Sequence, residues 1–170
     1  DDVGIFSRGN VEIENSIVKA EAGEDCDGIL ARDTATITGS WIETSGTEAF
    51  TEGSDSIANS VLFNGKSGKV IGDVLLPGDA EVASDMELLI PEGTSLKVGS
   101  GTTFVNHGTV TVAGTFAADG GTVECDSHSG GTATCTKQAE CGVCGTAYGD
   151  LNAANHTGEA VWTTTETRHE

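Results

Sequence analysis

Three stretches of the chain align with one another residue by residue, and this repetition limits the folds that the sequence can adopt. The stretches are residues 4–18, 28–42 and 48–62, at offsets of 24 and then 20 residues. A repeat of this length is typical of a solenoid, in which each coil cannot bury its apolar side alone and stacks on its neighbours. The sequence therefore predicts stacked coils in which Ile13, Ile37 and Ile57, at the same place in each stretch, form one ladder.

Apolar and polar residues alternate inside each repeat, as Val11 and Ile13 show in the first one. A period of two is the spacing of β-strands, whose alternate side chains point to the same face. Asn15, Gly39 and Asn59 follow the aligned isoleucines, each before a serine. Asn and Gly tolerate positive φ angles, so we expect the chain to turn a corner of the coil at these positions.

From residue 86 onward the repeat becomes shorter. Gly-Thr recurs at residues 93–94, 101–102, 108–109 and 114–115, each time followed closely by Leu, Phe or Val. Three such units make about one full coil of the earlier kind, which predicts a three-sided helix of parallel strands with Gly-Thr at its corners. Residues 69–76 are expected to form one connecting strand, and residues 79–85, where the periodicity lapses, a loop.

Composition and charge exclude several classes of protein. The chain has 24 Gly and only two Pro, and aromatic residues make up 5% of it, which favours short strands and tight turns over helices. A net charge of −19 argues against binding to nucleic acid, because phosphates would be repelled. No apolar run reaches bilayer length, so we expect no membrane insertion. The first residues already run into a repeat, so we expect the chain to be a piece of a longer polypeptide, with neighbouring domains as partners.

The regular pattern stops near Gly120-Gly121, and four of the five cysteines follow. We therefore predict an all-β protein with two units. Residues 1–122 are expected to form a right-handed parallel β-helix, a type of β-solenoid. Residues 123–170 are expected to form a small Cys/His-rich tail.

The tail has the residue types of a zinc knuckle. Cys141 and Cys144 are separated by two residues, and two thiolates at this spacing can bind one ion. With Cys135 as the third thiolate and His128 as the fourth ligand, the set becomes Cys₃His, and His156 is the alternative fourth ligand. Four protein ligands fill a tetrahedral zinc site and leave no position for water, so this pattern predicts structural rather than catalytic zinc.

Two other interpretations of the cysteines remain open at the level of sequence. Cys125 and His128 also form a half-site, and with Cys141 and Cys144 they would make a pair of knuckles that leaves Cys135 free. Disulfide bonding is the other alternative, since it is common in exported proteins. Five cysteines cannot all pair with one another.

The repeat pattern of residues 4–16, followed by the motifs at 88–96 and 106–110, resembles the β-helix segments of large cell-surface proteins of gut Firmicutes. Residues 130–151 resemble a Cys-rich repeat of the same proteins. The resemblance implies an extracellular, cell-wall-associated location and no cofactor beyond the zinc. Pectin lyases share the general fold, but their catalytic residues have no counterpart that we can place on this chain.

We therefore expect a non-catalytic structural or adhesive module of a larger secreted protein, with a carbohydrate or a host surface as its partner. The alternative is a carbohydrate-active enzyme of the polysaccharide lyase type, whose acids would be Asp25 and Asp27 near Arg32. Arg8 and Arg32 occupy equivalent places in successive coils, which favours a surface ladder over a catalytic site. Trp41 replaces smaller apolar residues at an aligned position, so we expect it in the core rather than stacked on a sugar.

Overall fold

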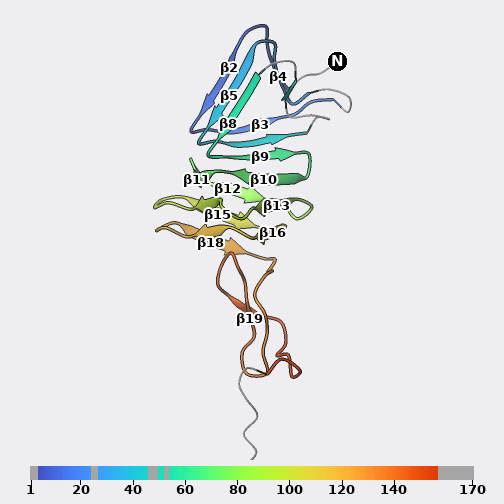
Figure 1. Ribbon diagram of the computed structural model, residues 1–170, viewed down its shortest axis with the longest axis vertical. Helices are drawn as coiled ribbons and strands as arrows, with labels where there is room; N and C mark the ends of the chain where they lie inside the picture. The colour runs from blue at the N-terminus through green and yellow to red at the C-terminus, as the bar shows by residue number, and fades with distance from the viewer. Residues whose placement is uncertain (1–3, 24–26, 46–49, 52–53, 157–170) are drawn as a thin grey trace, which may run out of the picture.

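The computed structural model describes residues 4–23, 27–45, 50–51 and 54–156 of the chain. Within these ranges every regular element is a β-strand, and the strands stack into an elongated parallel β-solenoid with a Cys/His-rich segment at its C-terminal end (Figure 1). The part of the chain that is described contains no long apolar helix of the kind that crosses a bilayer. The predicted all-β solenoid is confirmed.

The first half of the solenoid consists of three parallel sheets, one on each side of the coil. Its strands are β1 (Ile5–Ser7), β4 (Ile29–Ala31) and β7 (Phe50–Thr51) on one side; β2 (Val11–Glu14), β5 (Thr34–Thr38) and β8 (Ser54–Ala58) on the second; and β3 (Ile17–Ala20), β6 (Trp41–Thr44) and β9 (Ser60–Asn64) on the third.

The isoleucine ladder predicted from the repeats is present in the second sheet. Ile13 pairs with Ile37, and Ile37 pairs with Ile57, in the registers of β2, β5 and β8. Ile37 is fully buried, and the other two pack in the same cluster. The third repeat differs in one place, because β4 pairs Ile29 with Phe50, one residue later than the sequence alignment implies.

The corners of these coils also lie where the sequence predicts them. Asn15, Gly39 and Asn59 have φ angles of 45°, 61° and 48°. The serines that follow them connect the coils, because the Ser40 N–H donates to Ser60 Oγ at 3.1 Å, and Ser60 Oγ donates to the Ala58 carbonyl. Each corner is therefore held by a hydrogen bond between successive coils.

The chain reverses direction after β9, which the sequence analysis did not anticipate. β10 (Ser67–Ile71) pairs antiparallel with β9 through a two-residue loop at Gly65-Lys66. Gly65 has a φ angle of 58°, as the first loop position of a type II′ turn requires. The Asn-Gly dipeptide at residues 64–65, between two runs that pair as strands, is the signal that could have revealed the hairpin.

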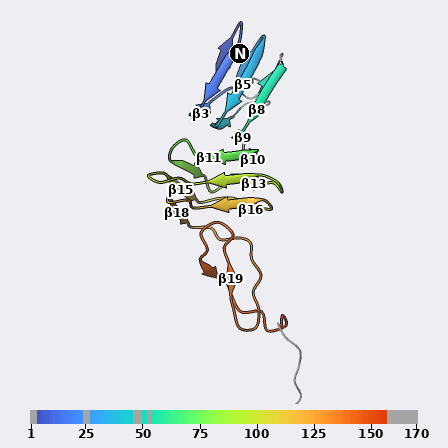
Figure 2. The same cartoon turned by 60° about the vertical axis from the view of Figure 1, so that its left-hand side comes forward.

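The hairpin places the two halves of the solenoid on opposite faces of one shared sheet. That sheet has the order β16-β13-β10-β9-β6-β3. Ile42 and Leu62 pack into the core cluster of the first half, whereas Trp41, Val61 and Phe63 pack into that of the second. Strand direction and the side of the core both change at this point, so the two halves keep the same sense of winding, and they meet at β9 and β10 (Figure 2).

The second half adds two further three-stranded sheets and the remaining strands of the shared one. These strands are β13 (Glu87–Ile90) and β16 (Thr109–Val112) in the shared sheet; β11 (Asp73–Leu75), β14 (Ser95–Lys97) and β17 (Thr115–Ala117); and β12 (Ala80–Val82), β15 (Thr103–Asn106) and β18 (Thr122–Cys125).

The four Gly-Thr pairs named above stand at the starts of β14, β15, β16 and β17, as predicted. At the corner before β16, a Cβ atom on Gly108 would lie 2.3 Å from the Ala83 carbonyl oxygen, so only glycine fits there. Two expectations were wrong. Residues 69–76 are not one strand, because Gly72, with a φ of 71°, separates β10 from β11. Residues 79–85 are not wholly a loop, because β12 pairs with β15.

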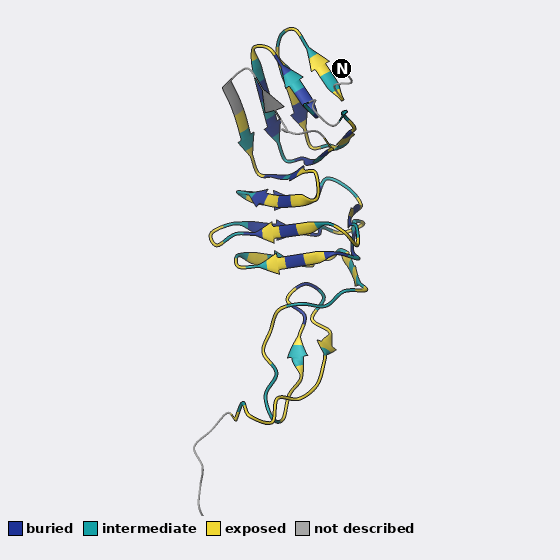
Figure 3. Cartoon of the chain, turned by 90° about the vertical axis from the view of Figure 1, so that its right-hand side faces the viewer, coloured by how far each residue is buried: buried dark blue, intermediate teal, exposed yellow. Residues whose placement is uncertain are grey.

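The tail begins where the last coil ends. β18 pairs with β15 as far as Cys125, so the solenoid extends three residues past the expected boundary at 122. The tail contains a short antiparallel hairpin of β19 (Ala139–Glu140) and β20 (Ala147–Tyr148). Cys141 and Val143 are buried in the same core cluster as the second half of the solenoid, while much of the remaining tail is exposed (Figure 3).

Candidate metal centre

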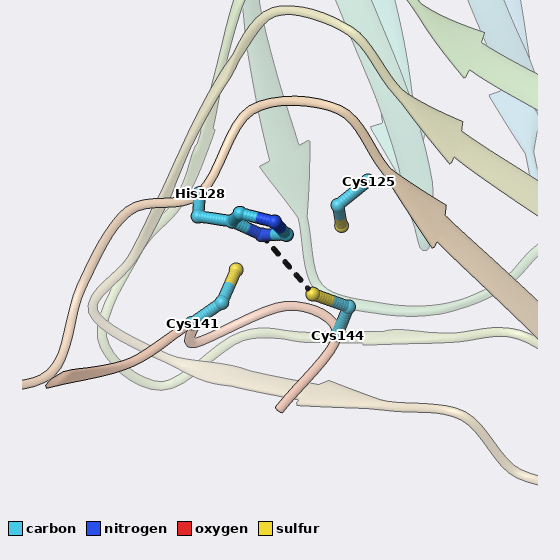
Figure 4. Close-up of side chains that lie close together, drawn as sticks. All are labelled: Cys125, His128, Cys141 and Cys144. Atoms are coloured by element: carbon cyan, nitrogen blue, oxygen red, sulfur yellow. Dashed lines mark hydrogen bonds between the residues drawn. The ribbon is translucent and has the colours of Figure 1, made fainter. Parts of the chain in front are cut away.

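Four side chains converge where the last coil meets the tail. Cys125, His128, Cys141 and Cys144 each offer one ligand atom, and these four atoms all lie within 4.8 Å of one another (Figure 4). The Sγ atom of Cys144 lies 3.4 Å from Nδ1 of His128. All four cysteines that the structure describes are free thiols.

The solenoid positions the first two ligands. Cys125 is the last residue of β18 and pairs with Asn106 of β15. His128 follows the bend at residues 126–127, and this bend is attached to the preceding coil. The Asp126 N–H donates to the Asn106 carbonyl at 3.0 Å, and the Asp126 carboxylate lies 2.7 Å from Nδ1 of His107.

The tail hairpin positions the other two ligands. Cys141 follows β19, and Cys144 lies in the tight turn that leads to β20. The turn is closed by hydrogen bonds from the Cys141 N–H to Thr146 and from the Gly145 N–H to Cys141, both at 2.9 Å. Gly145 has a positive φ of 72°, which lets the backbone turn back within a few residues.

Two contacts join the two halves of the centre. The Gly142 N–H donates to the Ser129 carbonyl at 2.9 Å, and the Ser129 hydroxyl donates to the Val110 carbonyl at the same distance. The His128 ring lies beside the Tyr148 ring, with 5.7 Å between centroids. These contacts hold the knuckle with Cys141 and Cys144 against the last coil without the help of an ion.

The donor set fits zinc. Zinc lies about 2.3 Å from sulfur and about 2.0 Å from imidazole nitrogen, so ligand atoms of a tetrahedral site are about 3.5–3.8 Å apart. The distance of 3.4 Å from Cys144 to His128 and the 4.8 Å limit for the whole group are compatible with small side-chain adjustments. Three thiolates and one imidazole are a soft donor set of the kind that structural zinc prefers.

The environment of the centre separates the pKa values of its thiols. Burial by itself raises the pKa of Cys141, but N–H groups of the turn, including those of Cys144 and Val143, stabilise its thiolate and lower the pKa to about 6. Burial also opposes ionisation of Cys144, whose pKa is nevertheless lowered by hydrogen bonds from Thr146. These two thiols are therefore prepared to act as thiolate ligands.

The pKa values of Cys125 and His128 are raised instead. Burial, followed by the neighbouring Cys144 and Cys141, raises the pKa of Cys125 to about 12. The hydrogen bond with Cys141 raises the pKa of His128, against the effect of burial. Without a cation, a cluster of three thiols resists carrying three negative charges, so Cys125 keeps its proton. A divalent ion would remove that penalty.

The structure brings together Cys125, His128, Cys141 and Cys144, which is the alternative set predicted from the sequence. The preferred set, with Cys135 as the third thiolate, is not formed. Cys135 lies outside the group, and its N–H donates to the carbonyl of Asn155. His156 is exposed and is also outside the group. His128, Cys141 and Cys144 are common to both sets. Cys125 takes the third position because β18 ends there, which the spacing of the cysteines alone does not reveal.

The other candidates from the sequence give no second centre among the described residues. Asp25 lies outside them, so the acidic pair proposed for the enzyme alternative is not described as a pair. The Arg32 guanidinium lies 5.9 Å from the centroid of the Phe6 ring. Trp41 is fully buried, with its ring centroid 5.2 Å from that of Phe63 and its indole N–H donating to Glu43, so its place in the core is confirmed.

A groove of about 390 Å³ lies where the outer face of β3 and β6 meets β12 and β15. Its walls carry the carboxylates of Glu43, Asp79 and Glu81, and its apolar lining includes Ile17 and Val105. Lys19 forms an ion pair with Glu43 at 2.9 Å. The groove exists because the two halves of the solenoid lie on opposite faces of the shared sheet.

No family model matches the chain, and neither the curated proteins nor the solved structures contain a match to it.

Proposed function

We propose that this chain is a non-catalytic structural module whose solenoid is closed at its C-terminal end by a zinc-bound cap. Cys125, His128, Cys141 and Cys144 would hold the ion. The proposal extends to a role as a display or adhesive segment of a larger secreted, cell-wall-associated protein.

The observation that carries the proposal is the origin of the four ligands. Cys125 and His128 come from the end of the last coil, whereas Cys141 and Cys144 come from the tail hairpin. One ion on this set would reinforce the contacts that already join the two segments, which are the Gly142–Ser129 hydrogen bond and the burial of Cys141 and Val143 against the last coil. Four protein ligands complete the coordination sphere, so the ion would supply stability rather than activated water.

A cap is useful because, in the part of the chain that the structure describes, β16, β17 and β18 of the final coil each lie at the edge of their sheet. Phe116 and Val123 in this coil are only half-buried, and they pack on the same cluster that Cys141 and Val143 join from the tail. An uncovered end would expose apolar surface and open strand edges to other chains, and solenoids generally protect their ends with an atypical terminal segment. The knuckle is in the right place to do this.

The adhesive part of the proposal concerns the groove between the halves. Its volume is in the range of small-molecule sites, roughly 300–1,000 Å³, and its carboxylates could accept hydrogen bonds from sugar hydroxyl groups. Trp41 is buried and offers no stacking surface, so a glycan would be held by polar contacts. Binding of a panel of neutral glycans, compared between the native chain and Glu81→Ala, tests this part separately from the zinc.

Elemental analysis tests the main proposal. Protein purified without chelator should contain about one zinc per chain, and extended X-ray absorption should show about three sulfur ligands and one nitrogen ligand around it. A chain that carries no stoichiometric metal, with a disulfide between two of Cys125, Cys141 and Cys144, would contradict the zinc cap. Zinc bound to oxygen ligands would contradict the ligand set.

A further inference from the structure

Asn106 occupies a position where the rest of the solenoid has an apolar residue. It is the last residue of β15, points into the core and is 1% exposed. In the strand above it the aligned residue is Val82, which is fully buried, and in the strand below it is Cys125. A carboxamide in such a row is unfavourable unless its polar atoms are paired.

Only one of the two polar atoms of the Asn106 carboxamide has a hydrogen-bond partner. Its Nδ2 atom donates to the Ser127 carbonyl at 3.3 Å. Its Oδ1 atom is the one buried side-chain oxygen or nitrogen among the described residues that has no hydrogen-bond partner. Valine or leucine would avoid this desolvation cost, so stability of the core does not account for asparagine here.

Ser127 lies between the two ligands that the solenoid contributes. Asn106 contacts the Cys125–His128 turn through three groups: its backbone pairs with Cys125, its carbonyl accepts from the Asp126 N–H, and its side chain donates to the Ser127 carbonyl. The turn therefore takes its conformation from Asn106 over three successive residues. His128 is the next residue along the chain.

We propose that Asn106 is a positioning residue of the metal centre, and that its carboxamide holds the Cys125–His128 turn in the conformation that presents both side chains to the ion. The inference rests on the proposed zinc cap. Residues that support metal ligands from outside the coordination sphere fix the geometry of the ligands, and a site held in place beforehand loses less freedom when the ion binds.

If Asn106 has this role, replacing it by an apolar residue should lower zinc affinity without lowering the stability of the metal-free protein. Asn106→Leu replaces the carboxamide by an apolar group of similar size and removes the unpaired oxygen. We expect the metal-free variant to unfold at the same temperature as the native chain or at a higher one. Its zinc affinity should fall by about 10- to 100-fold, as is typical when a supporting partner of a ligand is lost. If Asn106 merely stabilised the core, its substitution would lower the unfolding temperature and the zinc affinity together.

The experiment uses the full chain and measures zinc affinity by competition with a chelator of known affinity, alongside thermal unfolding of the metal-free protein. Val82→Ala is the matched control, since it makes a cavity in the same row one coil away without touching the turn. It should lower the unfolding temperature and leave zinc affinity unchanged. Asn106→Ala leaves a cavity as Val82→Ala does, so should leucine disturb the packing, the zinc affinities of these two variants are compared at similar losses of stability. The Co²⁺ forms should show thiolate charge-transfer bands, shifted in the Asn106 variants and not in Val82→Ala.

Different results would contradict the zinc cap and the positioning role of Asn106. A native chain that binds no zinc overturns the zinc cap itself. A native chain that binds zinc, with Asn106→Leu and Asn106→Ala within twofold of its affinity, overturns only the role of Asn106. A loss of affinity that appears equally in Val82→Ala also overturns it, because general destabilisation would then explain the effect.

Discussion

The Cys144 thiol and the His128 imidazole lie 3.4 Å apart although one belongs to the tail hairpin and the other to the turn that leaves the last coil. The contact joins the end of the solenoid to the tail at a place where both backbones are already connected through Ser129 and Gly142.

The identity of the third thiolate can be tested with two serine substitutions. Cys125→Ser should lower zinc affinity by more than about 100-fold, since one of four ligand bonds is lost from a site whose binding energy is roughly 10–16 kcal/mol. Cys135→Ser is the matched control and should still bind about one zinc per chain with native affinity. Metal content after dialysis and chelator competition measure both. The opposite order of effects would restore Cys135 to the ligand set.

The fourth ligand can be tested in the same way with the histidines. His128→Ala should weaken zinc binding strongly, because it removes the only nitrogen ligand in the group. His156→Ala should leave affinity unchanged, since His156 is exposed and outside the group. Isothermal titration with Zn²⁺ measures both variants. A loss of binding in His156→Ala alone would show that the tail adopts a different ligand arrangement.

The pH dependence of zinc binding follows from the pKa values of the thiols. Cys125, with its pKa raised to about 12, is protonated at neutral pH, whereas Cys141, with its pKa lowered to about 6, is mostly ionised. Zinc must therefore displace at least the Cys125 proton, so affinity should rise about tenfold per pH unit between pH 7 and 9. Below about neutral pH the dependence should steepen, because the His128 imidazole, whose pKa is raised by Cys141, and then Cys141 also become protonated. Proton release measured with a pH indicator should be at least one per ion, and a pH-independent affinity would contradict this.

The ladder of isoleucines makes a prediction about stability. Ile37→Asp places a carboxylate without a partner at a fully buried position, and we expect the free energy of unfolding of the first half to fall by roughly 4 kcal/mol or more. Ser56→Asp is the control, because Ser56 is exposed on β8 next to Ile57. Urea unfolding followed by circular dichroism distinguishes them. Similar midpoints for the two variants would show that the ladder is not part of the core.

Much of the solenoid could be predicted because its signals are local. Ile13, Ile37 and Ile57 repeat at fixed offsets, and a two-residue alternation decides which face each side chain takes. Asn15, Gly39 and Asn59 stand where positive φ angles are needed, and that requirement depends only on the residue and its neighbours. The shorter repeats with Gly-Thr corners followed from the same reasoning.

Three features could not be obtained in this way. The Asn-Gly dipeptide indicates a hairpin at Gly65, but it does not indicate that the core moves to the other face of the shared sheet, because the choice of face depends on which apolar residues find partners across the sheet. β12 has little periodicity of its own and exists because β15 offers it a parallel partner. The supporting role of Asn106 is invisible in sequence, since a lone asparagine before a histidine is an ordinary turn pattern.

The sequence by itself determined that the chain forms stacked coils of short strands, where most of their corners lie, and that a Cys/His cluster follows, because repetition and spacing are properties of neighbouring residues. Only the tertiary structure decided that Cys125 and not Cys135 joins His128, Cys141 and Cys144. The physical reason is that strand pairing between β15 and β18 fixes where Cys125 stands, and a ligand set depends on distances in space that the number of intervening residues does not specify.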